Sequence, residues 1–145
     1  MITIRDSMFE TNSSNMHNMI MCDDETYNAF VNGDMLWYCS SQLVDTSTAY
    51  TDYVSYMKEE QFDQYIVELD AFKEHTKTYD YDNSHSPYKD DSDEIKQKKY
   101  VHRFMHDYGY GSYNSFHSYE YETIDQTAVI HGIKVHAIGY HGSDR

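Results

Sequence analysis

Residues 51–74, TDYVSYMKEEQFDQYIVELDAFKE, decide the fold class that this sequence predicts. Apolar residues recur in this stretch at intervals of three and four, as they do on the buried face of an α-helix. The most regular positions are Phe62, Tyr65, Ile66, Leu69 and Phe72. We therefore expect the best helix of the chain here, with the intervening acidic residues on its solvated face.

The sequence before this stretch predicts a strand, a short helix and a second strand. Residues 18–22 (NMIMC) form an apolar run, and Asp23 or Asp24 after it can cap a helix. That helix is expected to stop at Asn32-Gly33, since glycine favours the left-handed residue that ends many helices. Residues 35–39 (MLWYC) then read as a largely buried strand.

The sequence after residue 74 predicts a long exposed loop and a further helix. Residues 76–92 are polar and contain the only proline, Pro87, so we expect an irregular connection. Ser92 is a candidate cap for the next helix, which Gly109 can terminate. Its expected buried stripe is Val101, Phe104, Met105 and Tyr108.

The C-terminal part of the chain predicts strands. Residues 119–123 (YEYET) alternate, a turn is expected near Asp125-Gln126, and residues 127–140 suggest a hairpin that breaks at Gly132. We expect one domain, residues 1–145, of the α+β class. Its predicted architecture is an antiparallel sheet of about four to five strands with two to three helices packed on one face.

The composition limits the classes of partner. The chain of 145 residues has 11 Lys and Arg against 25 Asp and Glu, a net charge of -14. Such a surface repels nucleic acid and anionic membranes, so we expect direct binding to neither, and it favours basic proteins. Tyrosine, at 16 residues, is common enough to supply much of the core and to contribute to a binding surface.

Targeting signals and cysteines indicate a cytoplasmic protein. We find no apolar run of the roughly 18 residues that a membrane helix needs, and no secretion signal. Cys22 and Cys39 lie within apolar runs, where buried thiols are expected rather than a disulfide.

The tract FETNSSNMH, residues 9–17, gathers residue types that catalysis uses. Glu10, Ser13, Ser14 and His17 could supply an acid, a nucleophile and a base within one loop. However, no GxSxG motif surrounds either serine, and Asn and Ser more often form turns with the neighbouring backbone. We therefore predict a structured connection here, without catalytic residues.

The histidines are weak candidates for a metal site. His102 and His106 have the i, i+4 spacing of zinc ligands, but Arg103 stands where a zinc protease has glutamate. A third ligand could come from Asp107, from His117 or from the C-terminal histidines His131, His136 and His141. Those three are spaced by five, so consecutive members point to opposite faces of a regular strand. We predict neither a metal nor a cofactor.

An acidic surface is the stronger candidate. The tracts YDYD (79–82) and YEYE (119–122) would place carboxylates about 6.6 Å apart along one face of a strand, similar to a row of phosphates. The alternative is that tyrosine packs inward and the acid serves only solubility. The candidate partner-binding residues are Asp63, Glu68, Asp70, Tyr79, Asp80, Tyr81, Asp82, Asp90, Asp91, Glu120 and Glu122.

Both ends of the chain resemble a group of small uncharacterised bacteriophage proteins. Residues 8–14 (MFETNSS) followed by His17 resemble the FETNSSS-type opening of these proteins, although Asn15 replaces a further small hydroxyl residue. Residues 135–142 (VHAIGYHG) resemble their ending. The resemblance covers about a fifth of the chain. It implies a protein made during infection that acts in the cytoplasm of the bacterial host.

The resemblance and the charge together give a leading hypothesis of host inhibition. Acidic phage proteins often present a DNA-like surface to nucleases, CRISPR effectors, transcription or nucleoid proteins, and a Lon-type protease is another candidate target. One alternative is a small hydrolase or nuclease that uses His17 or the pair His102 and His106, with or without a metal. Another is a structural component of a phage complex. The sequence leaves the oligomeric state open, a homodimer included.

Overall fold

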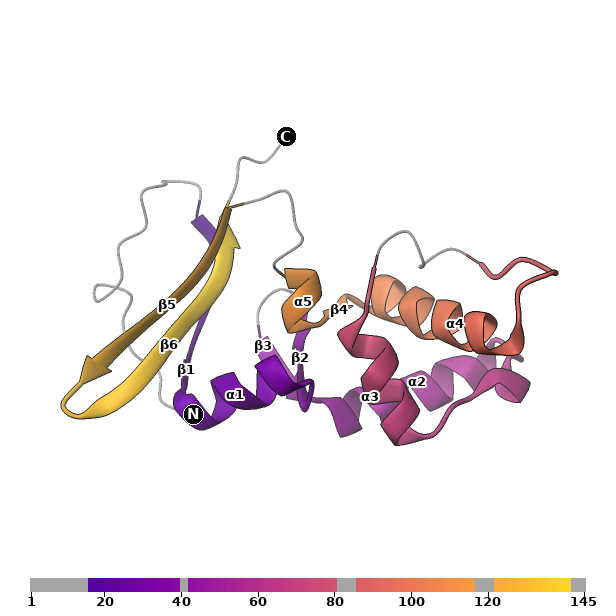
Figure 1. Ribbon diagram of the computed structural model, residues 1–145, viewed down its shortest axis with the longest axis horizontal. Coiled ribbons are helices and arrows are strands. Elements are labelled where there is room, and N and C mark those ends of the chain that lie inside the picture. Colours follow the sequence, from indigo (N-terminus) through magenta and orange to yellow (C-terminus); the bar gives the residue numbers. More distant parts are fainter. Residues whose placement is uncertain (1–15, 40–41, 81–85, 117–121, 142–145) are drawn as a thin grey trace.

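The computed structural model describes residues 16–39, 42–80, 86–116 and 122–141 (Figure 1). The strands are β1 Met16–Asp23, β2 Met35–Tyr38, β3 Gln42–Asp45, β4 Tyr110–Gly111, β5 Glu122–Ile130 and β6 Ile133–His141. The helices are α1 Asp24–Asn32, α2 Thr46–Glu59, α3 Leu69–Lys77, α4 Asp93–Tyr108 and α5 Tyr113–Phe116, with one 3-10 turn, η2 Asp63–Tyr65. The predicted α+β class is confirmed.

The described strands are divided between two antiparallel sheets rather than forming one sheet of four or five strands. The first sheet has the order β1-β6-β5 and the second β3-β2-β4. The molecule is elongated: the first sheet lies at one end and α2, α3 and α4 at the other (Figure 1). The second sheet, α1 and α5 lie between these two ends.

Strand β2 separates two hydrophobic clusters. Successive residues of a strand point to opposite faces. Leu36 accordingly belongs to the cluster of the helical end, with Tyr53, Phe72 and Phe104. Trp37 belongs to a second cluster, which contains Ile20, Cys22, Phe30, Leu43 and Ile138. The run MLWY is continuously apolar because both of its faces are buried.

The prediction of a helix over residues 62–72 is wrong for the first half of that range. Helix α2 begins five residues earlier than predicted and ends before Gln61, whose φ of 64° is left-handed. Only η2 follows, and residues 66–68 are not helical. The hydroxyl of Tyr50 donates to the Val67 carbonyl at 2.8 Å, and the Val67 N–H donates to the Tyr53 hydroxyl at 3.1 Å. These two bonds satisfy the backbone C=O and N–H of Val67, which would otherwise form hydrogen bonds within a helix.

The predicted helix caps are confirmed. The Thr26 N–H donates to Asp23 Oδ1 at 2.8 Å, and α1 ends at Gly33 with a φ of 89°. Ser92 Oγ accepts a hydrogen bond from the Ile95 N–H at 3.3 Å, and Gly109 follows α4 with a φ of 77°. These signals are local, so tertiary contacts did not alter them.

The break predicted at Gly132 in the C-terminal hairpin is confirmed, but the additional turn predicted before it is wrong. Strand β5 continues through Asp125 and Gln126, so the turn expected there is wrong. Tyr27 and Tyr113 donate hydrogen bonds to the Asp125 carboxylate, which lets a charged residue occupy the middle of a strand. The turn is His131-Gly132, with φ values of 52° and 79°, as a two-residue type I′ turn requires.

Other expectations have mixed outcomes. The predicted stripe of α4 is buried at Val101, Phe104 and Met105, but Tyr108 is 39% exposed. Cys22 is buried as expected and Cys39 is exposed, because it follows β2 in a left-handed conformation, with a φ of 52°. Both thiols are free. The prediction missed the short elements β3, β4 and α5, which depend on partners distant in the sequence.

The described parts of the predicted loop, residues 78–80 and 86–92, contain no helix or strand, although α3 extends to Lys77. Of the tract FETNSSNMH, residues 9–15 lie outside the described residues, and Met16 and His17 begin β1. Among the described helices, none has the length and apolar character needed to cross a membrane.

Candidate functional site

Three predicted partner-binding residues lie where the chain passes from α2 to α3. Asp63 begins η2, Glu68 immediately precedes α3, and Asp70 lies in the first turn of α3. A carboxylate in the first turn also interacts favourably with the positive end of the helix dipole. Glu59 and Glu60 stand at the end of α2. All five side chains are exposed, and residues 59–72 contain no lysine or arginine. We call the five residues the acidic rim.

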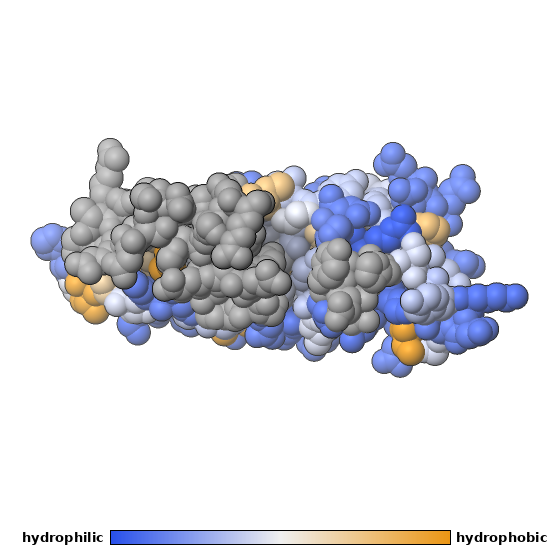
Figure 2. Space-filling view, turned by 90° about the horizontal axis from the view of Figure 1, so that it is seen from above, coloured by the Kyte–Doolittle hydropathy of each residue, from blue (hydrophilic) through white to orange (hydrophobic). Residues whose placement is uncertain are grey.

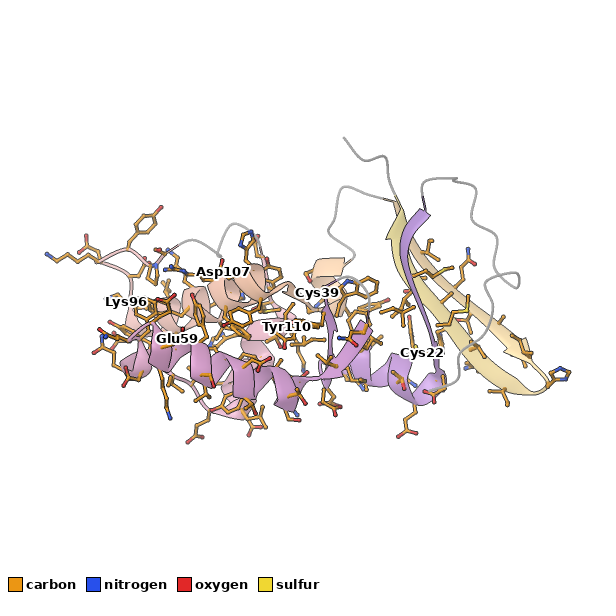
Figure 3. All side chains as sticks on the ribbon, turned by 180° about the vertical axis from the view of Figure 1, so that it is seen from behind. Cys22, Cys39, Glu59, Lys96, Asp107 and Tyr110 are labelled. Atoms are coloured by element: carbon orange, nitrogen blue, oxygen red, sulfur yellow. The ribbon has the colours of Figure 1, made fainter. Side chains whose placement is uncertain are left out.

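The negative charge of the acidic rim is not neutralised within the described part of the chain. Among the described residues, none of its carboxylates forms an ion pair with a basic side chain, whereas Lys73 and Lys99 pair with carboxylates outside the acidic rim. Lys73 Nζ lies 3.2 Å from Asp34 Oδ1 and Lys99 Nζ lies 2.8 Å from Asp91 Oδ2. Glu59 lies at the helical end (Figure 3), which is mostly hydrophilic on the face seen in Figure 2. The acidic rim is thus a local excess of exposed carboxylates.

The structure does not gather all predicted partner-binding residues on one surface. Asp91 belongs to the turn before α4, where its carboxylate accepts hydrogen bonds from the Tyr88 N–H and Lys99 Nζ, both at 2.8 Å. The Lys99 hydrogen bond lowers the pKa of Asp91. Asp90 is exposed beside it. Glu122 begins β5, at the opposite end of the molecule (Figure 1).

The YDYD tract is described only at its first two residues. Tyr79 is half-buried and lies edge-on to the ring of His102, with 5.4 Å between the ring centroids, while Asp80 is exposed. Tyr79 therefore packs against the core, as the alternative interpretation of this tract expected. The candidates outside the described residues are Tyr81, Asp82 and Glu120.

His102 and His106 do not form a shared ligand site. His102 is fully buried, and its Nε2 lies 2.8 Å from the His75 carbonyl oxygen, to which it donates. Burial lowers the pKa of His102 to about 4. His106 is exposed on the same helix and contacts Asp107 at 3.4 Å. Across the residues that the structure describes, no three His, Cys, Asp or Glu side chains are grouped to hold a metal ion.

A hydrogen-bonded chain around His136 was missed by the sequence-based prediction. His136 is 4% exposed, and its Nε2 lies 2.8 Å from Asp24 Oδ1 in the first turn of α1. A carboxylate only accepts hydrogen bonds, so Nε2 carries a proton. When the ring is neutral, Nδ1 accepts a hydrogen bond from the Thr127 hydroxyl, 3.0 Å away on β5. The bond from His136 lowers the pKa of Asp24.

A tyrosine of α1 holds this histidine and links it to a second polar group. The ring of Tyr27 stacks on His136 at a centroid distance of 3.9 Å and an interplanar angle of 4°. The Tyr27 hydroxyl donates to Asp125 Oδ1 at 3.1 Å, and the Tyr113 hydroxyl donates to Asp125 Oδ2 at 2.8 Å. Burial, followed by these hydrogen bonds, raises the pKa of Tyr113. The network fixes α1 and α5 on one face of the first sheet.

The chemistry available at His136 is acid–base chemistry. Asp24, His136 and Thr127 are connected in the order of an orienting acid, a base and a hydroxyl, and Thr127 is exposed. The register of the hairpin could have identified Thr127 and His136 as neighbours from the sequence. A turn placed at His131-Gly132 puts Thr127 directly opposite His136.

Cys22 lies in β1, within the hydrophobic cluster against which Tyr27 and Tyr113 pack, and Cys39 lies near Tyr110 (Figure 3). Burial raises the pKa of Cys22 to about 11, which leaves its thiol protonated and inert. Comparison with protein-family models, curated proteins and solved structures gives no match, so the case for a function rests on the residues described above.

Proposed function

We propose that the protein is an acidic, phage-encoded inhibitor that binds a basic, nucleic-acid-binding protein in the cytoplasm of the bacterial host. The observation that carries the proposal is the acidic rim, five exposed carboxylates without an ion pair among the described residues. The net charge of -14 supports it, because it draws basic partners from a distance. The resemblance of both chain ends to bacteriophage proteins supports the setting.

Inhibition would follow from competition with nucleic acid. A groove of lysine and arginine that holds DNA phosphates also attracts carboxylates, and its counterions are released when either ligand binds. Binding by the acidic rim is therefore strongest at low salt and excludes duplex DNA from the same groove. The candidate targets are host nucleases, CRISPR effectors, transcription and nucleoid proteins, and a Lon-type protease.

Affinity capture from bacterial lysate tests this proposal. The triple variant Asp63→Asn, Glu68→Gln, Asp70→Asn removes three charges from the acidic rim. The matched control, Glu25→Gln, Asp45→Asn, Glu94→Gln, removes three exposed charges that also lie near helix N-termini. We expect the wild type and the control to capture a basic protein at low salt and to release it at high salt. Loss of three exposed charge pairs should weaken capture by the rim variant about tenfold or more.

The captured protein is then assayed for DNA binding. Wild-type acidic protein should inhibit this binding in proportion to the fraction of the captured protein that it occupies. Absence of a basic partner at low salt, or equal capture by the rim variant and the control, would count against the proposal. Capture that is insensitive to salt would do so as well, since screening must weaken an association driven by exposed charge.

A second candidate function is hydrolysis of an activated ester, favoured by the chain Asp24–His136–Thr127. The Thr127 oxygen would attack the acyl carbon while His136 Nδ1 accepts the hydroxyl proton and then passes it to the departing alcohol. Water, losing a proton to His136 Nδ1, would then attack the acyl carbon on Thr127. The acid would be released, and the proton would return from His136 to the Thr127 oxygen.

p-Nitrophenyl acetate is a suitable probe for this candidate. We expect wild-type protein to release p-nitrophenol and Thr127→Ala to lose that activity, while Thr48→Ala, an exposed threonine on α2, retains it. Mass spectrometry should detect an acetyl group on Thr127 of the wild type. Equal rates for the two variants would eliminate Thr127 as the nucleophile.

A further inference from the structure

A fully buried imidazole lies beneath the C-terminal end of α3. Helix α3 packs against α4 (Figure 1), and His102 of α4 meets the last turn of α3. His102 Nε2 lies 2.8 Å from the His75 carbonyl oxygen, and the ring of Tyr79 stands perpendicular to the imidazole at a centroid distance of 5.4 Å. Residues 75–80 therefore cover His102, and we call them the α3 cover.

The second ring nitrogen of His102 has no place for a proton while the α3 cover is closed. Because Nε2 donates to the His75 carbonyl, Nδ1 is the unprotonated nitrogen of the neutral ring. Nδ1 is buried and has no hydrogen-bond partner among the described residues. A proton there would add a positive charge and an unpaired N–H donor to the interior, and burial of either is costly. The closed α3 cover thus favours the neutral imidazole.

The groups around this ring oppose its protonation on balance. Burial lowers the pKa of His102 most strongly, Lys98 of α4 and the imidazole of His75 lower it further, and Asp80 of the α3 cover raises it. Burial also lowers the pKa of His75. The charged groups that act on His75 are Glu74 on α3 and Glu94 and Lys98 on α4. Both imidazoles therefore bind protons more readily when the α3 cover is open.

The α3 cover is held less firmly than the helix beneath it. Helix α4 is 16 residues long and contributes Val101, Phe104 and Met105 to the core, whereas α3 is nine residues long. The N–H groups of Thr78 and Tyr79 bond back to carbonyls of α3 itself, at 3.3 Å and 3.2 Å. These bonds are lost together when the last turn unwinds. We therefore expect the α3 cover to open at a lower free energy than α4.

We propose that the α3 cover is an acid-sensitive switch, closed over neutral His102 and opened when His102 takes up a proton. Opening moves the last turn of α3 away from α4 and lets water reach Nδ1. It also releases Tyr79, a candidate partner-binding residue, from the ring of His102. Acid thus converts Tyr79 from a core contact into a surface group. The switch needs no partner protein, so it stands independently of the proposed function.

Thiol labelling at residue 76 tests the switch on the full chain. Thr76 is buried within the α3 cover. In a Cys39→Ser background, which removes the exposed thiol, Thr76→Cys places a thiol that a disulfide reagent reaches when the α3 cover opens. Dithiodipyridine is suitable because it reacts with thiols in mild acid. Each rate is divided by the rate for the same chain unfolded in urea at the same pH. The matched reference is Ala49→Cys, a buried position of α2 in the same hydrophobic cluster.

The corrected labelling rate at residue 76 should rise about twentyfold from pH 7 to pH 5 through His102 alone. The open form binds this proton with a pKa of 6.5 and the closed form with a pKa of about 4. In His102→Gln the rise should shrink by about that factor, since an amide still donates to the His75 carbonyl but does not titrate. The double variant His75→Gln, His102→Gln should show no rise. His106→Gln, exposed on the same helix, should retain the full rise.

Two results would overturn the proposal. Labelling of Thr76→Cys no faster than that of Ala49→Cys would mean that the whole helical core opens at once. An undiminished rise in His102→Gln would assign the response to other groups. If circular dichroism shows that His102→Gln does not fold, Lys98→Gln replaces it. Removal of that positive charge eases protonation of the closed form and should reduce the rise about twofold, so an unchanged rise would then reject the switch.

Discussion

His102 shows how a single buried residue couples the stability of this protein to pH. Its ring lies within the helical core, Nε2 donates to the His75 carbonyl, and Nδ1 has no hydrogen-bond partner among the described residues. Burial lowers the pKa of His102 from 6.5 to about 4. Between these values the unfolded chain binds a proton that the folded chain does not. The free energy of unfolding therefore falls as the pH falls through this window, by up to about 3 kcal/mol in total.

Replacement of His102 should remove most of this dependence. In wild-type protein, urea unfolding at pH 7 and pH 5 should give free energies that differ by about 2 kcal/mol from His102 alone. We expect His102→Gln to show a much smaller difference, with a remainder from His75, whose pKa is also lowered by burial. The exposed His106→Gln serves as the control and should behave as wild type. The same loss of stability in His102→Gln would contradict the prediction.

At the scale of the element, the end of α2 shows how a helix can stop without glycine. The Gln61 N–H donates to the Lys58 carbonyl at 3.1 Å and the Phe62 N–H donates to the Met57 carbonyl at 2.7 Å. This is the bond pattern of a Schellman motif, with Gln61 in the left-handed position that glycine usually occupies. A side chain in this conformation costs about 1 kcal/mol. The amphipathic pattern continues past Gln61, which explains why the sequence predicted a helix there.

Two glutamine-to-glycine substitutions should therefore have opposite effects. Gln61→Gly removes the strain of the left-handed residue and should leave the free energy of unfolding unchanged or raise it, by up to about 1 kcal/mol. Gln97→Gly, in the interior of α4, should lower it by about 1 kcal/mol, because glycine disfavours a helix. Urea unfolding measures both. An equal decrease in the two variants would show that Gln61 is not strained.

At the scale of the whole molecule, the net charge of -14 opposes folding. The acidic rim and the other exposed carboxylates repel one another, and this repulsion is stronger in the compact state than in the extended chain. Salt shortens the range of the repulsion, to a Debye length of about 10 Å at 0.1 M.

Stability should accordingly rise with ionic strength. Between about 0.02 M and 0.2 M sodium chloride, we expect the Tm to increase by about 2 to 4 °C. The acidic-rim triple variant, with three fewer negative charges, should start from a higher Tm and respond less. Calorimetry provides the measurement, and choline chloride as the salt tests whether sodium itself binds. A Tm that falls as salt increases would mean that ion pairs, rather than repulsion, dominate the electrostatics of the fold.

Much of the fold was determined by signals within a few residues of the sequence. Asp23 and Ser92 cap their helices, and Gly33 and Gly109 end them, because a cap needs only neighbouring backbone groups. The α+β class and the exposure of the acidic rim follow from the hydrophobic pattern and the charge, which do not depend on how the elements are arranged. Asp63, Glu68 and Asp70 remained exposed even though the helix predicted around them was interrupted.

The places where long-range partners override local preferences depend on packing between distant segments. Tyr50 and Tyr53 bind the backbone of Val67 and hold residues 66–68 out of a helix. Strand β2 contributes Leu36 to one hydrophobic cluster and Trp37 to the other, and the described strands form two sheets instead of one. The network at His136 connects α1 to a hairpin more than a hundred residues later in the chain. Such contacts depend on register and packing between distant segments, and no pattern within one segment contains that information.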